Sequence, residues 1–185
     1  DLPNATGALR ANKSWFYLRD AVVCLGSAVA DTSGTAVRTI AENRAFAVGD
    51  LPEVRLDGEP GSLSDTAVPA GSVHVAGHAG IRALAPSGRE AQPLAVRSVR
   101  RTGTWQTINS GGDTGGSATE VSRDYVRVEV DHAEADWYAY EVLPLATAEQ
   151  TEVPSSVEVV VEPQAHVLTA GSTVMAHVFA AGTAG

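Results

Sequence analysis

Cysteine is almost missing from this sequence, and its scarcity excludes two common kinds of site. Cys24 is the single cysteine among 185 residues, so the chain has no disulfide framework and no thiolate metal cluster. The residue lies in the apolar run Ala21–Leu25, where a buried, inert thiol is the expected state. The P-loop, Rossmann, nucleophile-elbow, HExxH and EF-hand motifs are absent as well. We therefore expect no cofactor and no metal.

Basic residues are also few. The sequence has 13 Lys and Arg residues and 22 Asp and Glu residues, which gives a net charge of −9. This balance argues against nucleic acid as a partner, because binding to a phosphate backbone depends on Lys and Arg. Any site for an acidic polymer must then be a local basic strip within a negative surface. No apolar run approaches the roughly 20 residues that span a bilayer, so we expect no membrane partner.

Helical periodicity is nearly absent, and short, Val-rich, alternating stretches broken by Gly, Pro, Asp and Ser recur instead. This pattern predicts an all-β fold, an antiparallel β-sandwich. A Thr/Ala/Glu-rich stretch over residues 146–154 suggests a boundary near residue 150. Residues 1–150 would form the sandwich, and residues 151–185 a short C-terminal β-hairpin segment. The residues expected in the core are Trp15, Tyr17, Val22, Leu25, Ile40, Leu84, Val126, Val128, Tyr140 and Val142.

The C-terminal segment carries a turn signal at Gly171-Ser172. A glycine at the first central position favours a two-residue type II′ turn. The resulting register places His166 opposite His177 and Leu168 opposite Met175. The other face of the hairpin is then assigned to the core, and it comprises Val167, Thr169, Val174, Ala176 and Val178.

Three segments carry a family resemblance. They are residues 12–27 (NKSWFYLRDAVVCLGS) followed by Glu42-Asn43-Arg44, residues 101–109 (RTGTWQTIN), and residues 138–144 (YAYEVLP). In this order they resemble the β-sandwich region of the hyaluronate, chondroitin AC and xanthan lyases. The resemblance implies a sandwich fold and action on hyaluronan or a related acidic polysaccharide. That family's catalytic asparagine, histidine, tyrosine and arginine belong to an α/α-toroid with no counterpart in residues 1–185, so none is carried over.

β-Elimination at a uronate needs donors that neutralise a carboxylate and groups that move protons. Arg and Asn supply planar donors, and an aromatic ring suits a sugar face. Arg97, Arg101, Trp105 and Asn109 recur at steps of four, so they share one side of a regular strand. We interpret them as substrate-binding residues. The alternative is a solvated strand face whose Arg stems cover apolar surface.

His78 and Tyr125 are the candidate catalytic residues for proton transfer. A histidine can act as a general base, and Tyr125, which lies between Arg123 and Arg127, can serve as a base or an acid. A hydrogen-bonded histidine and a half-buried packing tyrosine are the alternatives. His74 and His78 resemble a metal spacing only superficially, because four residues along a strand span about 13 Å.

Two functions follow. The first is a compact enzyme that degrades hyaluronan, by β-elimination rather than hydrolysis. The second is a non-catalytic carbohydrate-binding or scaffold module of a larger glycosaminoglycan lyase. We expect a secreted, extracellular location, since Asp1 begins the chain without an apolar leader, as in a processed secreted protein.

Overall fold

The computed structural model describes residues 8–108 and 116–179, and strands dominate it. In spatial order, the seven-stranded sheet contains β1 (Leu9–Tyr17), β2 (Val22–Asp31), β11 (Tyr138–Pro144), β8 (Ala79–Ala83), β7 (Ser72–Val75), β4 (Val54–Leu56) and β5 (Glu59–Pro60). The four-stranded sheet contains β3 (Arg38–Phe46), β10 (Val121–Asp131), β9 (Leu94–Gly103) and β6 (Val68–Ala70). A three-stranded sheet contains β12 (Val157–Glu162), β13 (Ala165–Ala170) and β14 (Thr173–Val178). The expected all-β, antiparallel sandwich is confirmed.

Within the described ranges, helix is limited to two short elements. α1 (Trp105–Ile108) follows β9, and α2 (Ala148–Glu152) follows β11. A capping box starts α2, because Thr147 accepts from the Gln150 amide and the Gln150 side chain accepts from the Thr147 amide. Neither helix is long or apolar enough to cross a bilayer.

The main core lies between the seven-stranded and four-stranded sheets. Alternation along β10 decides which side chains enter it: Val126, Val128 and Val130 are buried, while Tyr125 and Arg127 point to the other face. Opposite them, Val73, Val75 and Ile81 belong to the same apolar cluster and come from β7 and β8. The opposite face of β10 is therefore free to carry polar side chains.

A second core lies on the far side of the seven-stranded sheet. It is covered by the three-stranded sheet of β12, β13 and β14, which we call the C-terminal sheet. It contains Phe16, Val23, Leu25, Leu84, Ala139, Val159, Val161 and Leu168. The central part of β2 is consequently buried on both faces, which explains why its sequence is an apolar run and not an alternation. The expected boundary at residue 150 falls within α2, and the segment after it contains three strands that form this third layer.

Several residues expected in the core are exposed, and the prediction was wrong for them. Trp15 is 53% exposed and Tyr17 is 76% exposed, because the edge strand β1 turns Ser14 and Phe16 towards the C-terminal sheet instead. Ile40 is exposed too, since it lies directly opposite Glu129 on the outer face of the four-stranded sheet. Val22 and Val142 are half-buried, and the other five are buried as expected.

The expected register of the C-terminal hairpin is confirmed. His166 pairs with His177, Leu168 pairs with Met175, and Gly171 has a φ of 57°. The expected faces are reversed, because the side that carries His166 and Leu168 is the buried one. A histidine can occupy this core position because two serine hydroxyls of the neighbouring sheet hydrogen-bond to its ring.

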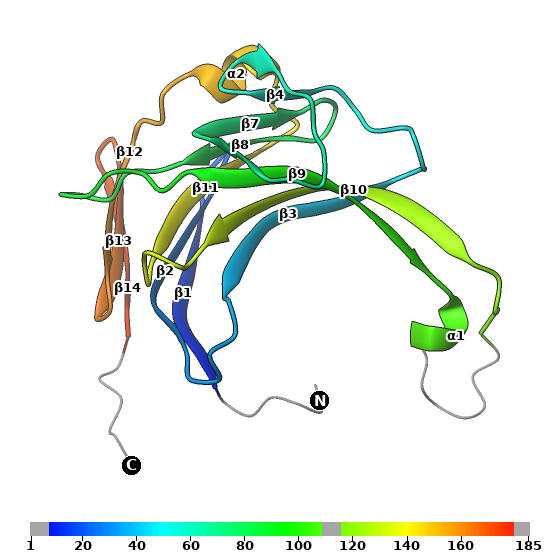
Figure 1. Cartoon of the computed structure of the whole chain (residues 1–185). Helices are drawn as coiled ribbons and strands as arrows, with labels where there is room; N and C mark the ends of the chain where they lie inside the picture. The colour runs from blue at the N-terminus through cyan, green and yellow to red at the C-terminus, as the bar shows by residue number, and fades with distance from the viewer. Residues whose placement is uncertain (1–7, 109–115, 180–185) are drawn as a thin grey trace.

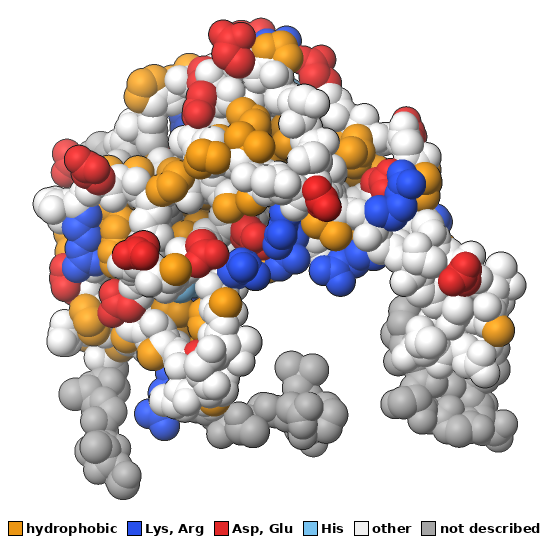
Figure 2. All heavy atoms as spheres, in the orientation of Figure 1, with side chains coloured by type: hydrophobic (Ala, Val, Ile, Leu, Met, Phe, Trp, Pro, Cys, Tyr) orange, Lys and Arg blue, Asp and Glu red, His pale blue; other side chains and the backbone are white. Residues whose placement is uncertain are grey.

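The described part of the molecule is an arch (Figure 1), with the C-terminal sheet and β1–β2 on one side and α1 on the other. The four-stranded sheet forms its roof. Figure 2 shows Lys and Arg side chains gathered under that roof, in the hollow of the arch. A molecule with a net charge of −9 thus has a concentrated positive area on its concave side.

Candidate functional site

The face of β9 and β10 that points away from the main core carries four arginines in two facing pairs. The strands pair so that Arg97 lies opposite Arg127 and Arg101 lies opposite Arg123. Between these pairs, Val99 faces Tyr125. Residues directly opposite each other in antiparallel strands share a face, and the other face of β10 is the buried valine face. We call the surface formed by Arg97, Arg101, Arg123 and Arg127 the basic face.

A groove of about 620 Å³ lies at one end of the basic face. Arg101, Arg123, Tyr125 and Trp105 all contribute to its lining. Trp105 begins α1, one residue after the end of β9, and is 60% exposed. The turn that contains it is held by hydrogen bonds between Thr104 and Thr107. The groove therefore combines guanidinium groups with an open aromatic ring.

Two of the three arginines that line the groove, Arg101 and Arg123, are available to a ligand. Neither Arg101 nor Arg123 forms an ion pair with a carboxylate of residues 8–108 or 116–179. Like charges directly opposite each other destabilise a strand pair, so an anion between them would be favoured. Arg100 is occupied: its Nε and Nη2 donate to Asp124 at 2.7 and 2.9 Å. Those bonds and the Gly49 amide lower the pKa of Asp124 to about 2.

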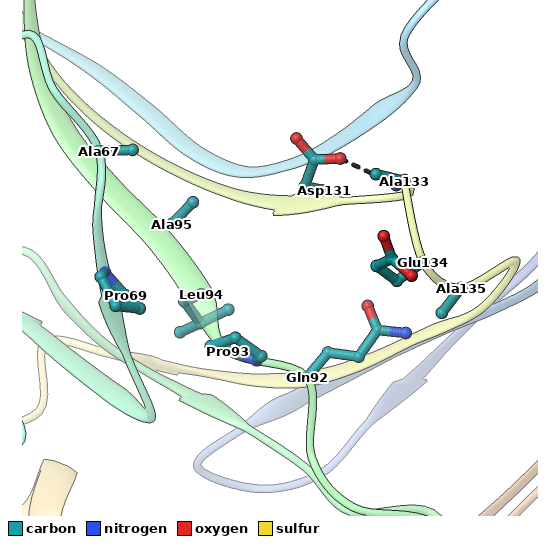
Figure 3. A pocket seen from close by; sticks show the side chains of 10 residues that line it. All are labelled: Ala67, Pro69, Gln92, Pro93, Leu94, Ala95, Asp131, Ala133, Glu134 and Ala135. Atoms are coloured by element: carbon teal, nitrogen blue, oxygen red, sulfur yellow. Dashed lines mark hydrogen bonds between the residues drawn. The ribbon is translucent and has the colours of Figure 1, made fainter.

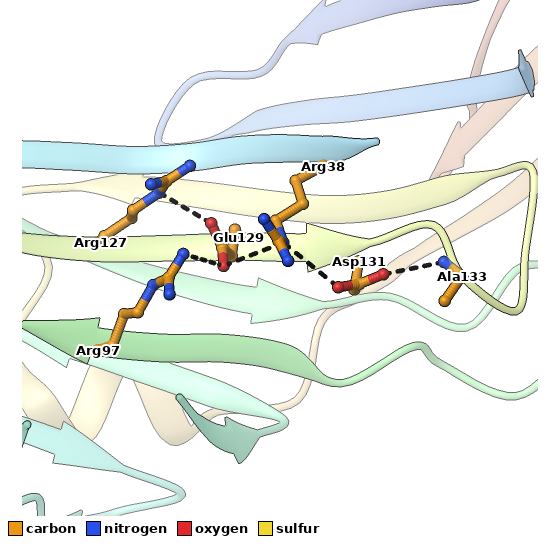
Figure 4. A network of polar contacts seen from close by, with 6 residues as sticks. All are labelled: Arg38, Arg97, Arg127, Glu129, Asp131 and Ala133. Atoms are coloured by element: carbon orange, nitrogen blue, oxygen red, sulfur yellow. Dashed lines mark hydrogen bonds and ion pairs between the residues drawn. The ribbon is translucent and has the colours of Figure 1, made fainter. Parts of the chain in front are cut away.

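The other end of the basic face is a polar network around Glu129 (Figure 4). Arg97 Nη2 donates to Glu129 Oε1 at 2.9 Å. Arg127 Nε lies 2.8 Å from Oε2, and Arg38 Nε lies 3.6 Å from Oε1 and 3.3 Å from Asp131 Oδ2. Arg97, which the sequence placed in one strip with Arg101, thus belongs to this network and not to the groove lining.

Of the other candidates, Tyr125 lies in the groove with Arg101 and Trp105, whereas Asn109 falls outside the described residues. The structure places His78 elsewhere, in the turn between β7 and β8, where its ring packs against Phe46 at 5.3 Å. Phe46 pairs with Asp124, and Tyr125 pairs with the residue before Phe46, so His78 and Tyr125 lie on opposite sides of the sheet. The structure does not bring these two together.

His74 and His78, the two histidines with a metal-like spacing, both contact protein groups. His74 is buried and its Nε2 lies 3.1 Å from the Ala146 carbonyl oxygen. Within the described residues no group of three or more His, Cys, Asp or Glu side chains could hold a metal.

A second cavity, of about 340 Å³, was not expected from the sequence (Figure 3). Its floor is apolar, formed largely by Pro69, Leu94 and Ala95, and Asp131 and Glu134 lie at its edge. It contains no cationic or aromatic side chain among its lining residues, so it does not suit an acidic sugar. The groove remains the better candidate.

The groove can bind a carboxylate but contains few groups for catalysis. Guanidinium groups bind carboxylates with two parallel hydrogen bonds, and a tryptophan face can cover the apolar face of a sugar ring. Its described lining includes no His, Asp or Glu, so Tyr125 is the side chain there suited to general acid–base work. Arg123, which sequence reasoning did not select, could have been found from its alternation with Tyr125 in the stretch 123–127.

Comparisons with known proteins agree with this architecture. Residues 1–154 match the family model for polysaccharide lyase family 8, super-sandwich domain. A hyaluronate lyase of Thermasporomyces composti is 39% identical over 151 residues, which is 77% of this chain and 18% of that protein. A xanthan lyase of Bacillus sp. (strain GL1) is 30% identical over 161 residues, 81% of this chain and 17% of that protein. The chain thus spans less than a fifth of the length of these curated relatives.

Among solved structures, the chondroitin AC lyase of Streptomyces coelicolor A3 in complex with chondroitin sulphate has a TM-score of 0.71 and 25% sequence identity. The match covers 95% of this chain and 22% of that one. A further chondroitinase AC lyase, at 20% identity, has a TM-score of 0.76 and covers 96% of this chain and 26% of that one, which shows the likeness of fold. The chain belongs to polysaccharide lyase family 8, and its residues 1–154 are the family's super-sandwich domain.

Proposed function

We propose that this chain is the polymer-holding β-sandwich of a lyase that degrades hyaluronan, or a closely related acidic polysaccharide, by β-elimination. The observation that carries the proposal is the groove, in which Arg101 and Arg123 face each other without a described carboxylate partner. The relatives are named as lyases of hyaluronate and xanthan, which supports an acidic polysaccharide as the ligand. We also propose that the chain acts on this polymer outside the cell.

The chemistry of the groove fits this ligand class. A uronate offers one carboxylate to the guanidinium pair and one ring face to Trp105, which is on the same lining. The net charge of −9 repels a polyanion at long range, so binding must depend on these local contacts. Because partly exposed charge pairs are screened by salt, the affinity should fall as ionic strength rises.

A second candidate function is turnover by this chain alone. Tyr125 in the groove, next to Arg123 and Arg101, is the observation that favours it, since a phenol beside guanidinium groups can act as a base or an acid. Incubation of hyaluronan with the chain, followed by the ultraviolet absorbance of the unsaturated product and by viscosity, tests this function. Rising absorbance that Tyr125→Phe abolishes would support it, and falling viscosity without absorbance would indicate a hydrolase.

Binding itself is tested by isothermal titration of hyaluronan oligosaccharides into the wild type and two groove variants, Arg101→Gln and Trp105→Ala. Two variants far from the groove serve as matched controls. Arg19→Gln removes a highly exposed arginine, and Trp15→Ala removes a tryptophan of similar exposure. We expect the groove variants to lose about tenfold or more in affinity and the controls to bind normally. Equal affinities for all five proteins would reject the groove as the site.

A further inference from the structure

The network around Glu129 has more hydrogen-bond donors than its own carboxylates use. Glu129 is only 2% exposed, and its two oxygens face the guanidinium groups of Arg38, Arg97 and Arg127. With Asp131 included, three positive charges meet two negative ones. The network therefore keeps one excess positive charge on the roof of the arch.

The guanidinium groups of Arg38, Arg97 and Arg127 are held in position by ion pairs, but they remain accessible to solvent. Their side chains remain 40%, 22% and 19% exposed for Arg38, Arg97 and Arg127 respectively. Each guanidinium group has five N–H donors, and the hydrogen bonds of this network among the described residues use only Arg97 Nη2 and Arg38 Nε. The Nε atoms of Arg97 and Arg127 are buried and, like Glu129 Oε2, have no hydrogen-bond partner there, so the partly exposed Nη groups are the donors left for a ligand. Glu129 holds the three groups in place, so little side-chain entropy is lost when an anion binds them.

We infer that Arg38, Arg97 and Arg127 form a second carboxylate-binding site, which we call the arginine cage. The inference rests on the proposed function, because the ligand is a further carboxylate of the same acidic polysaccharide that occupies the groove. Arg97 and Arg101 are four residues apart on β9, so the cage and the groove are separated by about 13 Å along the strand. A ligand that reaches both must be an oligosaccharide with repeated carboxylates and not a single sugar.

The arrangement gives the concave surface a way to distinguish a polymer from its fragments. A short oligosaccharide engages the Arg101–Arg123 pair alone, whereas a longer one also reaches the cage. The second contact is then intramolecular, so affinity rises steeply once the ligand spans both sites. Val99 and Tyr125 lie between the two sites and provide the surface over which the chain of sugars passes.

The test is isothermal titration of hyaluronan oligosaccharides of increasing length into the wild type, Arg38→Gln, Arg127→Gln and the control Arg19→Gln. We expect wild-type affinity to rise with length, and both cage variants to lose about tenfold for long ligands while short ligands bind as before. Arg19→Gln should match the wild type at every length. Melting temperatures show which variants are folded, and Arg38→Gln, at the most exposed cage position, keeps the test valid if Arg127→Gln unfolds.

Three results would overturn the inference while the groove stands: a wild-type affinity independent of length, folded cage variants that bind long ligands normally, or equal losses for short and long ligands. In each of these three cases Arg101→Gln would still weaken the binding of oligosaccharides to the groove. If the wild type binds no oligosaccharide at any length, the proposed function fails, and the inference fails with it.

Discussion

Lowering the pH should loosen the contact between the C-terminal sheet and the rest of the sandwich, because His166 is buried there in its neutral form. The ring lies between two hydroxyls, with Nδ1 2.7 Å from Ser14 Oγ and Nε2 2.9 Å from Ser27 Oγ. The ring of Phe179 packs against it at 4.8 Å. Burial, with a smaller contribution from the charge of His177, lowers the pKa of His166 to about 4.

The sign and size of the effect follow from this pKa. In the unfolded chain a histidine has a pKa of about 6.5, so between that pH and about 4 the unfolded state binds more protons than the folded state. The stability that the neutral ring provides is complete above the unfolded pKa and is lost as the pH falls towards the folded pKa. Because a tenfold difference in proton affinity between the two states corresponds to about 1.4 kcal/mol, the loss for His166 amounts to about 3 kcal/mol.

Urea unfolding of the wild type and His166→Gln at several values between pH 7 and pH 4 measures this loss. Glutamine keeps a donor and an acceptor for Ser14 and Ser27 but does not titrate. The wild type should lose about 3 kcal/mol more than the variant over this range, because carboxylate titrations are common to both proteins. His177→Gln, at an exposed position, should retain most of the wild-type pH dependence. A difference between wild type and His166→Gln that does not change with pH would refute the reasoning.

Two further substitutions test the network and the core. Glu129→Gln should lower the free energy of unfolding by about 2 kcal/mol and weaken the binding of long hyaluronan oligosaccharides despite the added positive charge, and tighter binding by a fully stable variant would contradict the cage. Gly26→Ala would place a methyl group into the buried Tyr138 ring, so urea unfolding should show a loss of about 2 kcal/mol or more. Gly103→Ala, where the added methyl meets no atom within 4 Å, is its control and should change stability little.

Local patterns in the sequence were enough to predict the all-β fold and several strand faces. In β10 the alternation put Val126 and Val128 inside, as expected for a strand with one buried face. The register of the C-terminal hairpin also followed from local information, since the turn at Gly171 determines which residues pair. Such features depend on neighbours within a few residues.

Features that depend on a third layer could not be predicted in this way. Trp15, Phe16 and Tyr17 are all apolar, and only the C-terminal sheet, some 150 residues later in the chain, decides that Phe16 is the buried one. The burial of His166 depends on Ser14 and Ser27 in the same way.

The groove was predictable only in part. Arg101 and Trp105 were expected on one side of a regular strand, but β9 ends at Gly103 and Trp105 begins α1. Both line the groove although the strand geometry assumed for them was wrong. The alternation in residues 123–127 puts Arg123 on the same face as Tyr125, but its place opposite Arg101 depends on the pairing of β9 with β10, which no local pattern determines. His78 was selected for its chemistry alone, and the fold places it on the other side of the sheet from Tyr125.

The measurement that tests the central claim most directly is a nuclear magnetic resonance titration of the chain with a hyaluronan oligosaccharide. The amide signals of β9 and β10 near Arg101, Arg123 and Tyr125 should shift in proportion to ligand bound, and signals of the C-terminal sheet should not. The shifts should shrink as salt is added. Shifts confined to the C-terminal sheet or to the exposed face of β1 at Trp15, with none in β9 and β10, would contradict the claim that the basic face holds the polymer.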